Sequence, residues 1–156
     1  MAISEQKISK ALNKVTNSAK EFSGLLNDLA DVLDADFEKV VRLTVLKLYR
    51  NIRLRSPVVT GAYRASHDIA IGAEPSESEG IKGLQTDEEL NALETQHPNL
   101  KWKIGDGTIW IFNNQPYASV LEAGSSTQAP QGIYAVALAE FENALRKEIK
   151  QARTLQ

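Results

Sequence analysis

The chain has 156 residues and a formal net charge of −2, with 42% hydrophobic and 24% charged residues, a composition typical of one ordinary soluble domain. It contains no cysteine and two histidines, which excludes disulfides, thiolate nucleophiles and cysteine-ligated zinc. The N-terminus is polar, and no apolar run approaches the roughly 18 to 20 residues that span a bilayer. We therefore expect a soluble cytoplasmic protein without a signal peptide or membrane contact.

The charges come in blocks of alternating sign. Residues 21–38 carry acids without Lys or Arg, residues 39–64 carry Lys and Arg without an acid, and residues 74–94 are again mainly acidic. Such blocks are commonly solvated faces. They also fit subunits that stack an acidic face on a basic one, or a basic helix that lines an anionic partner.

Apolar residues at helical spacing predict two helices in the N-terminal half. Residues 1–20 show this spacing weakly and predict a flexible or helical arm. Residues 22–33 predict an amphipathic helix, and residues 37–56 predict a second one with its arginines toward the C-terminal half. The second helix ends before Pro57, because the residue before a proline is pushed out of the α region.

The middle of the chain predicts strands and a long insert. Alternation of apolar and polar residues predicts a strand from Tyr63 to Gly72. Residues 73–99 are rich in Glu, Ser, Gly and Pro and predict a mobile acidic insert, in which Thr86 opens a short helix by a capping-box pattern. Asp106-Gly107 predicts a two-residue hairpin turn between strands at 101–105 and 108–113.

The C-terminal third predicts a short helix and a long one. Residues 117–123 lie between Pro116, which suits the first helical position, and Gly124, which suits a left-handed C-terminal cap. Of these residues, Tyr117, Val120 and Leu121 are expected to face the core. Glu122 near the end of this helix is unfavourable toward the helix dipole, so we expect it to have a partner outside the helix, an arginine or a backbone amide. Residues 134–149 predict a long amphipathic helix.

Together these elements predict an α+β fold with an antiparallel sheet of three to four strands packed against long N- and C-terminal helices. The domain organisation that we expect is an arm over residues 1–20 and a single domain over residues 21–156, with the mobile insert at 73–99.

The search for chemistry finds no catalytic constellation. His67 lies between Ser66 and Asp68, but neighbours on a strand point to opposite faces, so a partly buried strand histidine is the preferred interpretation. Glu122 is the only acid between Asp106 and Glu140, which leaves it without a carboxylate partner nearby. The chain has neither a Walker loop nor a GxGxxG motif. We expect no enzyme, cofactor or metal site; a hydrolase using His67 or Glu122 is the disfavoured alternative.

A nucleic-acid-binding adaptor is the second alternative. It would use the basic segment 39–64, although this segment lacks both the interleaved aromatic residues of a single-strand groove and a recognisable recognition helix.

Two stretches of the chain, SPVVTGAYRAS at 56–66 and NNQPYASVLEAGSSTQAPQG at 113–132, together resemble a family of tailed-phage neck and tail-completion proteins. These are the minor-tail-protein-Z-like proteins of siphophages and prophages, and the resemblance extends over residues 35–150. Val59 departs from the acidic residue that many relatives carry, and residues 128–132 replace their frequent Arg-Pro-Phe. The matching positions are Pro57, Thr60, Gly61, Arg64, Ser66, Asn113, Pro116, Tyr117, Ala118, Glu122 and Gly124.

The resemblance implies a virion structural protein at the head–tail junction that completes the tail and assembles as a ring. Its implied partners are further copies of itself, the tail terminator, the tail tube and the head-closure protein. Contact with DNA in the channel of the ring would fit both this family and the nucleic-acid-binding alternative. The implied location is the virion, after assembly from the host cytoplasm. On this basis we expect an assembly interface formed by Arg50, Arg53, Arg55, Thr60, Gly61, Arg64, Tyr117, Glu122, Gly124, Gln128 and Pro130.

Overall fold

The computed structural model of the protein describes residues 6, 21–31, 37–75 and 101–154. Residues 21–31 are helical, and the labelled elements follow them along the chain. Almost all of the predicted arm at 1–20, most of the insert at 73–99 and the helix predicted at Thr86 lie outside the described residues. The labelled elements are α2 (Phe37–Arg55), α3 (Ala62–Ala65), β1 (Asp68–Ile71), β2 (Ile109–Phe112), α5 (Ala118–Glu122) and α6 (Tyr134–Thr154).

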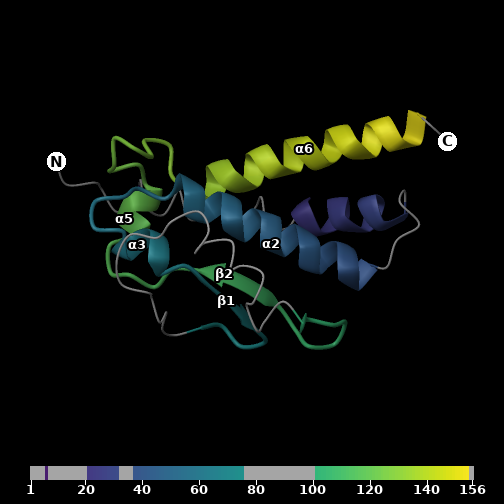
Figure 1. The fold of residues 1–156 in the computed structure, drawn as a ribbon, viewed down its shortest axis with the longest axis horizontal. Helices are drawn as coiled ribbons and strands as arrows, with labels where there is room; N and C mark the ends of the chain where they lie inside the picture. Colours follow the sequence, from purple (N-terminus) through teal and green to yellow (C-terminus); the bar gives the residue numbers. More distant parts are fainter. Residues whose placement is uncertain (1–5, 7–20, 32–36, 76–100, 155–156) are drawn as a thin grey trace.

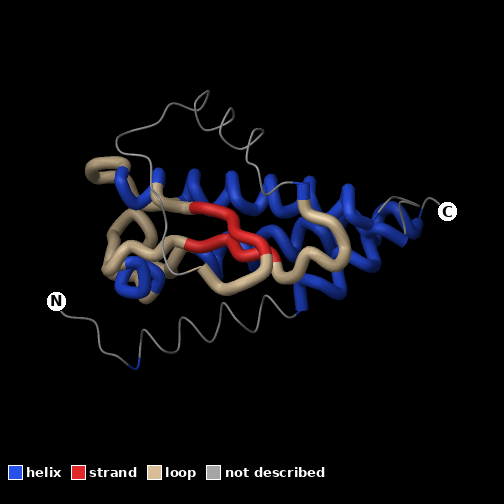
Figure 2. The backbone as a smooth tube through the Cα atoms, turned by 90° about the horizontal axis from the view of Figure 1, so that it is seen from below, coloured by secondary structure: helices blue, strands red, loops and turns tan. Residues whose placement is uncertain are grey.

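The helices form one layer and the strands lie beside it. In Figure 1, α2 crosses the middle of the molecule, with α6 and the helical residues 21–31 on one side and the two strands on the other. Figure 2, seen from the strand side, shows the sheet in front of the helices. We call residues 21–31, α2 and α6 the helical layer. Its buried apolar core includes Phe22, Leu25, Leu26, Leu29, Val40, Val41, Leu48, Ile52, Leu138, Leu145 and Ile149.

The two long helices form where their apolar spacing predicts them. On α2, Val41, Leu48 and Ile52 share the buried face, with Glu38 in the first turn and basic residues in the last. Its observed end at Arg55, two residues before Pro57, confirms the predicted stop.

The predicted sheet of three to four strands is wrong for the described residues, which hold a two-stranded antiparallel sheet. β1 pairs with β2 in a register that sets Asp68 opposite Phe112 and Ile71 opposite Ile109. The strands of this pair are therefore separated by a long stretch of chain, not by the two-residue turn that Asp106-Gly107 predicts.

The hairpin predicted at residues 101–113 is wrong because the Asp106 side chain makes a different local turn. Its carboxylate accepts from the Lys103 amide at 2.8 Å, while the Asp106 amide donates to the Lys103 carbonyl at 3.1 Å. Positive φ occurs at Gly105 and Gly107, at 100° and 98°. Asp side chains compete with sheet pairing through such bonds to nearby backbone groups, and residues 101–105 do not form a strand beside β2.

The predicted strand at 63–72 is wrong in its first half. Gly61 has a φ of 83° and turns the chain into the one-turn helix α3. The Ser66 hydroxyl then donates to the Ala62 carbonyl at 2.7 Å and closes this turn, so that the strand starts only at Asp68. Alternation alone did not reveal the turn, because α3 is too short to show helical spacing.

Candidate functional site: a hydrogen-bonded block that joins the two motifs

The two motif stretches, far apart in the sequence, are joined side by side in the fold. The Asn113 amide donates to the Tyr63 carbonyl at 2.8 Å, and the Gln115 amide donates to the Ser66 hydroxyl at 2.9 Å. Gln128 bonds both backbone groups of Val58, accepting from its N–H at 3.0 Å and donating to its carbonyl at 3.2 Å. We call residues 56–67 and 113–135 the motif block.

Glu122 is the centre of the block. Its side chain is 6% exposed, and its two carboxylate oxygens accept from the backbone amides of Ile133, Tyr134 and Ala135 at 2.8, 2.9 and 3.0 Å. These amides belong to the start of α6, where backbone N–H groups lack partners within the helix and the helix dipole favours a negative charge. The expectation of a partner outside α5 is confirmed, and that partner is a set of three backbone amides.

Two glycines allow the start of α6 to lie this close to Glu122. A Cβ atom added to Gly124 would lie 2.3 Å from the Pro130 carbonyl oxygen, and one added to Gly132 would lie 2.5 Å from the Glu122 carbonyl oxygen. Both residues also have positive φ, 85° and 88°. The loop from Gly124 to Gly132 therefore folds back tightly onto α5, which brings the start of α6 to the Glu122 carboxylate.

Pro116 and Tyr117 differ from the predicted roles. α5 begins at Ala118, with Tyr117 in the N-cap position, so that Pro116 lies in the preceding turn and not at the first helical position. Tyr117 is 42% exposed rather than directed into the core, and its ring lies 5.8 Å from that of Tyr63.

His67 is the second buried polar centre of the block. Its Nε2 lies 2.6 Å from the Ser56 hydroxyl, and its Nδ1 lies 2.6 Å from the Tyr134 hydroxyl. Because Ser56 donates its proton to the Ile52 carbonyl at 2.9 Å, it must accept from Nε2–H. Nδ1 is then the acceptor for the Tyr134 hydroxyl, and the neutral imidazole has both nitrogens satisfied.

The surroundings of His67 favour this neutral form. Burial, assisted by the nearby guanidinium of Arg53, lowers the pKa of His67 to about 3. Burial also raises the pKa of Tyr134 well above its ordinary value. The nitrogen that faces Ser56 carries a proton, and the ring does not take up a second one near neutral pH. The trio thus connects the residue after α2, the residue before β1 and the start of α6, and it does not activate the serine as a nucleophile.

The C-terminal half of α2 also contacts His67. The Tyr49 hydroxyl donates to the His67 carbonyl at 2.7 Å, and the guanidinium of Arg53 lies 5.2 Å from the centre of the Tyr49 ring. Arg64 donates to the Arg53 and Leu54 carbonyls at 2.9 and 3.4 Å. A cation at the C-terminal carbonyls of a helix is favoured by the helix dipole.

The structure thus divides the predicted interface residues into two groups. Arg53, Gly61 and Glu122 are buried, while Arg64 and Gly124 are occupied by the contacts described above. Arg55 forms an ion pair with Glu140 of α6. The members of the predicted set with exposed surface are Arg50, Thr60, Tyr117, Gln128 and Pro130.

The partners that complete the block were not identified from the sequence. Tyr49, Ser56 and Tyr134 surround His67, but they lie on α2, after α2 and at the start of α6, and no spacing in the sequence relates them. Val59, where the chain departs from the family pattern, is 89% exposed in the segment between α2 and α3.

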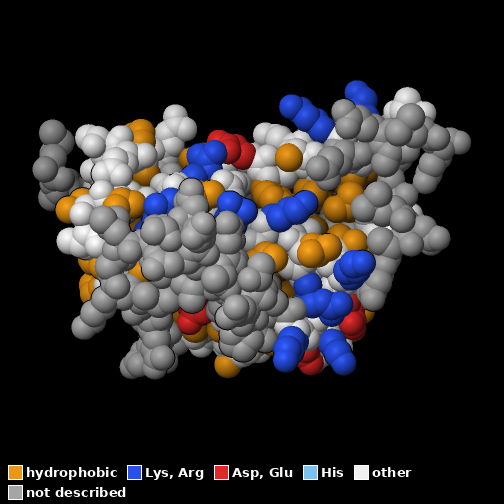
Figure 3. Space-filling view, viewed as in Figure 1, with side chains coloured by type: hydrophobic (Ala, Val, Ile, Leu, Met, Phe, Trp, Pro, Cys, Tyr) orange, Lys and Arg blue, Asp and Glu red, His pale blue; other side chains and the backbone are white. Residues whose placement is uncertain are grey.

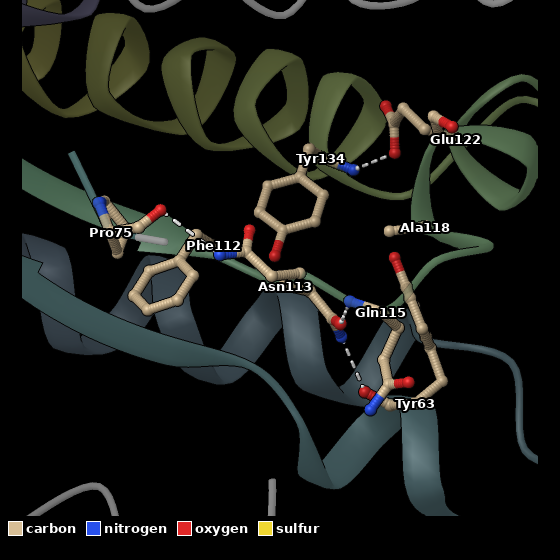
Figure 4. A pocket seen from close by; sticks show the side chains of 10 residues that line it. Tyr63, Pro75, Phe112, Asn113, Gln115, Ala118, Glu122 and Tyr134 are labelled. Atoms are coloured by element: carbon tan, nitrogen blue, oxygen red, sulfur yellow. Dashed lines mark hydrogen bonds between the residues drawn. The ribbon is translucent and has the colours of Figure 1, made fainter. Parts of the chain in front are cut away.

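A cleft of about 640 Å³ opens between the β2–α5 loop, α3 and the start of α6. Figure 4 shows the rings of Phe112, Tyr134 and Tyr63 around it, with Glu122 at its upper end. Its remaining lining comes from Pro75, Asn113, Asn114, Gln115, Ala118 and Ser119.

Within residues 6, 21–31, 37–75 and 101–154, no three His, Asp or Glu side chains are grouped so that they could hold a metal ion. No helix within the same ranges combines the length and apolar character needed to cross a bilayer.

No family model, curated protein or solved structure matches the chain.

Proposed function

We propose that the protein is a virion structural protein of a tailed phage that acts at the head–tail junction as a tail-completion or neck component and assembles as a ring. The observation that carries the proposal is the motif block. The two stretches on which the family resemblance rests are joined directly, and the resemblance positions Asn113, Glu122 and Gly124 each make a contact that holds the block together. These three matching residues thus belong to one structural unit.

The exposed surface of the block is suited to contacts with neighbours. Val59 at 89% and Tyr117 at 42% exposure are large apolar side chains on a block whose interior is fixed by hydrogen bonds. Exposed Thr60, Gln128 and Pro130 lie on the same two segments. A rigid scaffold that presents a loop surface is a common arrangement for binding. The proposed neighbours are further copies, the tail terminator, the tail tube and the head-closure protein.

The test is assembly. Light scattering and negative-stain microscopy of the protein, alone and mixed with the tail proteins encoded beside its gene, are expected to show rings. Val59→Asp is expected to abolish the rings, because it places a charge on the proposed contact surface. Ile104→Asp is the matched control, since Ile104 is also an exposed apolar residue, 67% accessible, but lies in the 103–106 turn. A strictly monomeric protein that is absent from purified virions would overturn the proposal.

The exposed basic residues of α2 support a nucleic-acid-binding adaptor as the second candidate. Lys39, Lys47 and Arg50 are exposed on this helix, and Figure 3 shows Lys and Arg side chains spread over the face that carries it. Buried Arg53 is not available for such binding, and exposed Leu43 and Leu54 interrupt the charges. This function predicts DNA retardation that falls steeply with salt and is lost in the Lys47→Glu, Arg50→Glu variant. Retention of DNA by that variant would exclude it.

A further inference from the structure

The register of the sheet determines which backbone groups point away from it. The Gly72 amide donates to the Thr108 carbonyl at 2.9 Å, which continues the register of the β1–β2 pair. In an antiparallel pair, positions that bond across the pair alternate with positions whose N–H and C=O groups point outward. On β2, the backbone of Trp110 is therefore bonded toward β1, whereas Ile109 and Ile111 direct their backbone groups to the outer edge.

The outer edge of β1 is closed by one of its own side chains. By the same alternation, the Ile69 amide points away from β2, and the Asp68 carboxylate accepts from it at 2.8 Å. Charged side chains at a sheet edge protect it against pairing with another strand. The edge at which a further strand could add is therefore that of β2.

The outer edge of β2 has no such protection. Among the residues that the structure describes, no hydrogen bond outside the ladder reaches the backbone of Ile109 or Ile111. Their side chains pack against the core, yet all four residues of β2 keep part of their surface exposed. Figure 2 shows the two strands in front of the helices, and the described chain places no third strand beside them. The strand reads Ile-Trp-Ile-Phe, without the Lys or Pro that commonly protects an edge.

The residues around β2 suit pairing with a second copy of the same strand. Residues 107–121 contain no charged side chain, so an antiparallel self-pair brings no like charges together. With Trp110 at a two-fold axis, Ile109 of one copy lies opposite Ile111 of the other, and each such pair can exchange both of its N–H···O bonds. The two Trp110 side chains then form an aromatic cross-strand pair. A two-fold contact uses the same surface on both copies, which fits one open edge in each copy.

We propose that two copies of the chain pair through the outer edges of their β2 strands and so join their sheets into one antiparallel sheet across a two-fold axis. The contact is short, and small interfaces are typical of weak association, so the dimer is expected to form in a concentration-dependent way. The pairing goes beyond the function proposed above, because it uses residues other than Val59 and Tyr117, on which the ring contact rests.

The test combines sedimentation velocity with hydrogen exchange by NMR on the full chain over a wide range of protein concentration. The sedimentation coefficient is expected to rise from that of a monomer to that of a dimer. Exchange of the Ile109 and Ile111 amides is expected to slow in parallel, because these amides gain acceptors only in the dimer. The Trp110 amide is the internal control, since it is bonded to β1 in both states and should be protected at every concentration.

Trp110→Lys sets like charges opposite each other at the axis and should raise the dissociation constant of the dimer at least about tenfold. Ala70→Lys is the matched control. Ala70 pairs with Trp110 on the same face of the sheet but does not lie at the axis, so this change should leave the dissociation constant unaltered. Circular dichroism checks that both variants fold, and if Trp110→Lys does not, the exchange of the wild-type amides decides.

A wild-type protein that stays monomeric at every concentration would overturn the pairing. So would a dimer in which the Ile109 and Ile111 amides exchange as fast as in the monomer, or equal affinity of the wild-type and Trp110→Lys dimers. These measurements need no tail proteins. Rings that form without the dimer would overturn this pairing alone, and a dimer that never forms rings would count only against the assembly proposal.

Discussion

The helical layer and the motif block are stabilised by different kinds of contact. The layer buries apolar side chains such as Leu48, Ile52 and Leu145 between helices, where the contacts are non-directional. The block joins short segments through buried polar groups, above all Glu122 and His67, whose bonds have fixed directions. The stability of the helical layer should therefore tolerate apolar substitutions that conserve volume. The stability of the motif block should fall when a single hydrogen-bonding atom is removed.

The largest expected effect in the block is at its central carboxylate. Glu122→Ala leaves three backbone amides of α6 without their acceptor, so we expect the free energy of unfolding to fall by about 3 to 5 kcal/mol. Urea denaturation measures this change. Glu140→Ala is the control, because it removes an exposed carboxylate from the Arg55 ion pair and should cost at most about 1 kcal/mol. Similar losses in the two variants would mean that Glu122 does not organise the block.

The glycines allow a direct comparison of the two regions. Gly124→Ala adds a methyl group that would lie 2.3 Å from the Pro130 carbonyl oxygen, at a positive φ, and should reduce stability by at least about 2 kcal/mol. Gly24→Ala in the helical layer meets no atom within 4 Å and should increase stability by about 0.5 to 1 kcal/mol. Thermal and urea unfolding of both variants measure the difference. If both substitutions raised stability, or both lowered it, the expected difference between the two regions would be contradicted.

The buried histidine makes the block sensitive to acid. The pKa of His67 in the folded protein, about 3, lies below the ordinary value of 6.5, so the unfolded chain binds the proton more readily between these values. Stability should be complete above pH 6.5 and fall by up to about 1.4 kcal/mol per unit as the pH drops from there toward 3. Urea midpoints from pH 7.5 to 4.5 measure the slope. His67→Gln should flatten the slope of stability against pH. His97→Gln, which removes the other histidine of the chain, should leave this slope unchanged. The reverse result would assign the slope to His97.

The smallest expected effect is at the surface of the block. Gln128→Ala removes the exposed pair of bonds to the Val58 backbone and should cost about 0.5 to 1.5 kcal/mol. Hydrogen exchange should show faster exchange of the Val58 amide in this variant. Gln131→Ala, on the same loop and also exposed, is the control and should leave that rate unchanged. An unchanged Val58 rate in Gln128→Ala would show that this pair does not hold the two segments together.

The elements that could be predicted are those whose signal is local and long. α2 and α6 repeat their apolar spacing over several turns, and Pro57 marks the end of the first. The prediction of a hairpin at Asp106-Gly107 is wrong because this pair suits a hairpin turn, but the Asp106 carboxylate can also accept from the Lys103 amide, as it does in the structure. The strand partner of β2 was missed because the register between β1 and β2 joins segments far apart in the chain.

For the site, the sequence by itself determined that Glu122 ends a short helix unfavourably and so requires a partner outside it, because the helix dipole acts locally. The tertiary structure decided that this partner is the start of α6. It also decided that Ser56, His67 and Tyr134 form one neutral trio and that Tyr63 lines a cleft. These contacts depend on which distant segments pack together, and packing leaves no periodic signal in a single sequence.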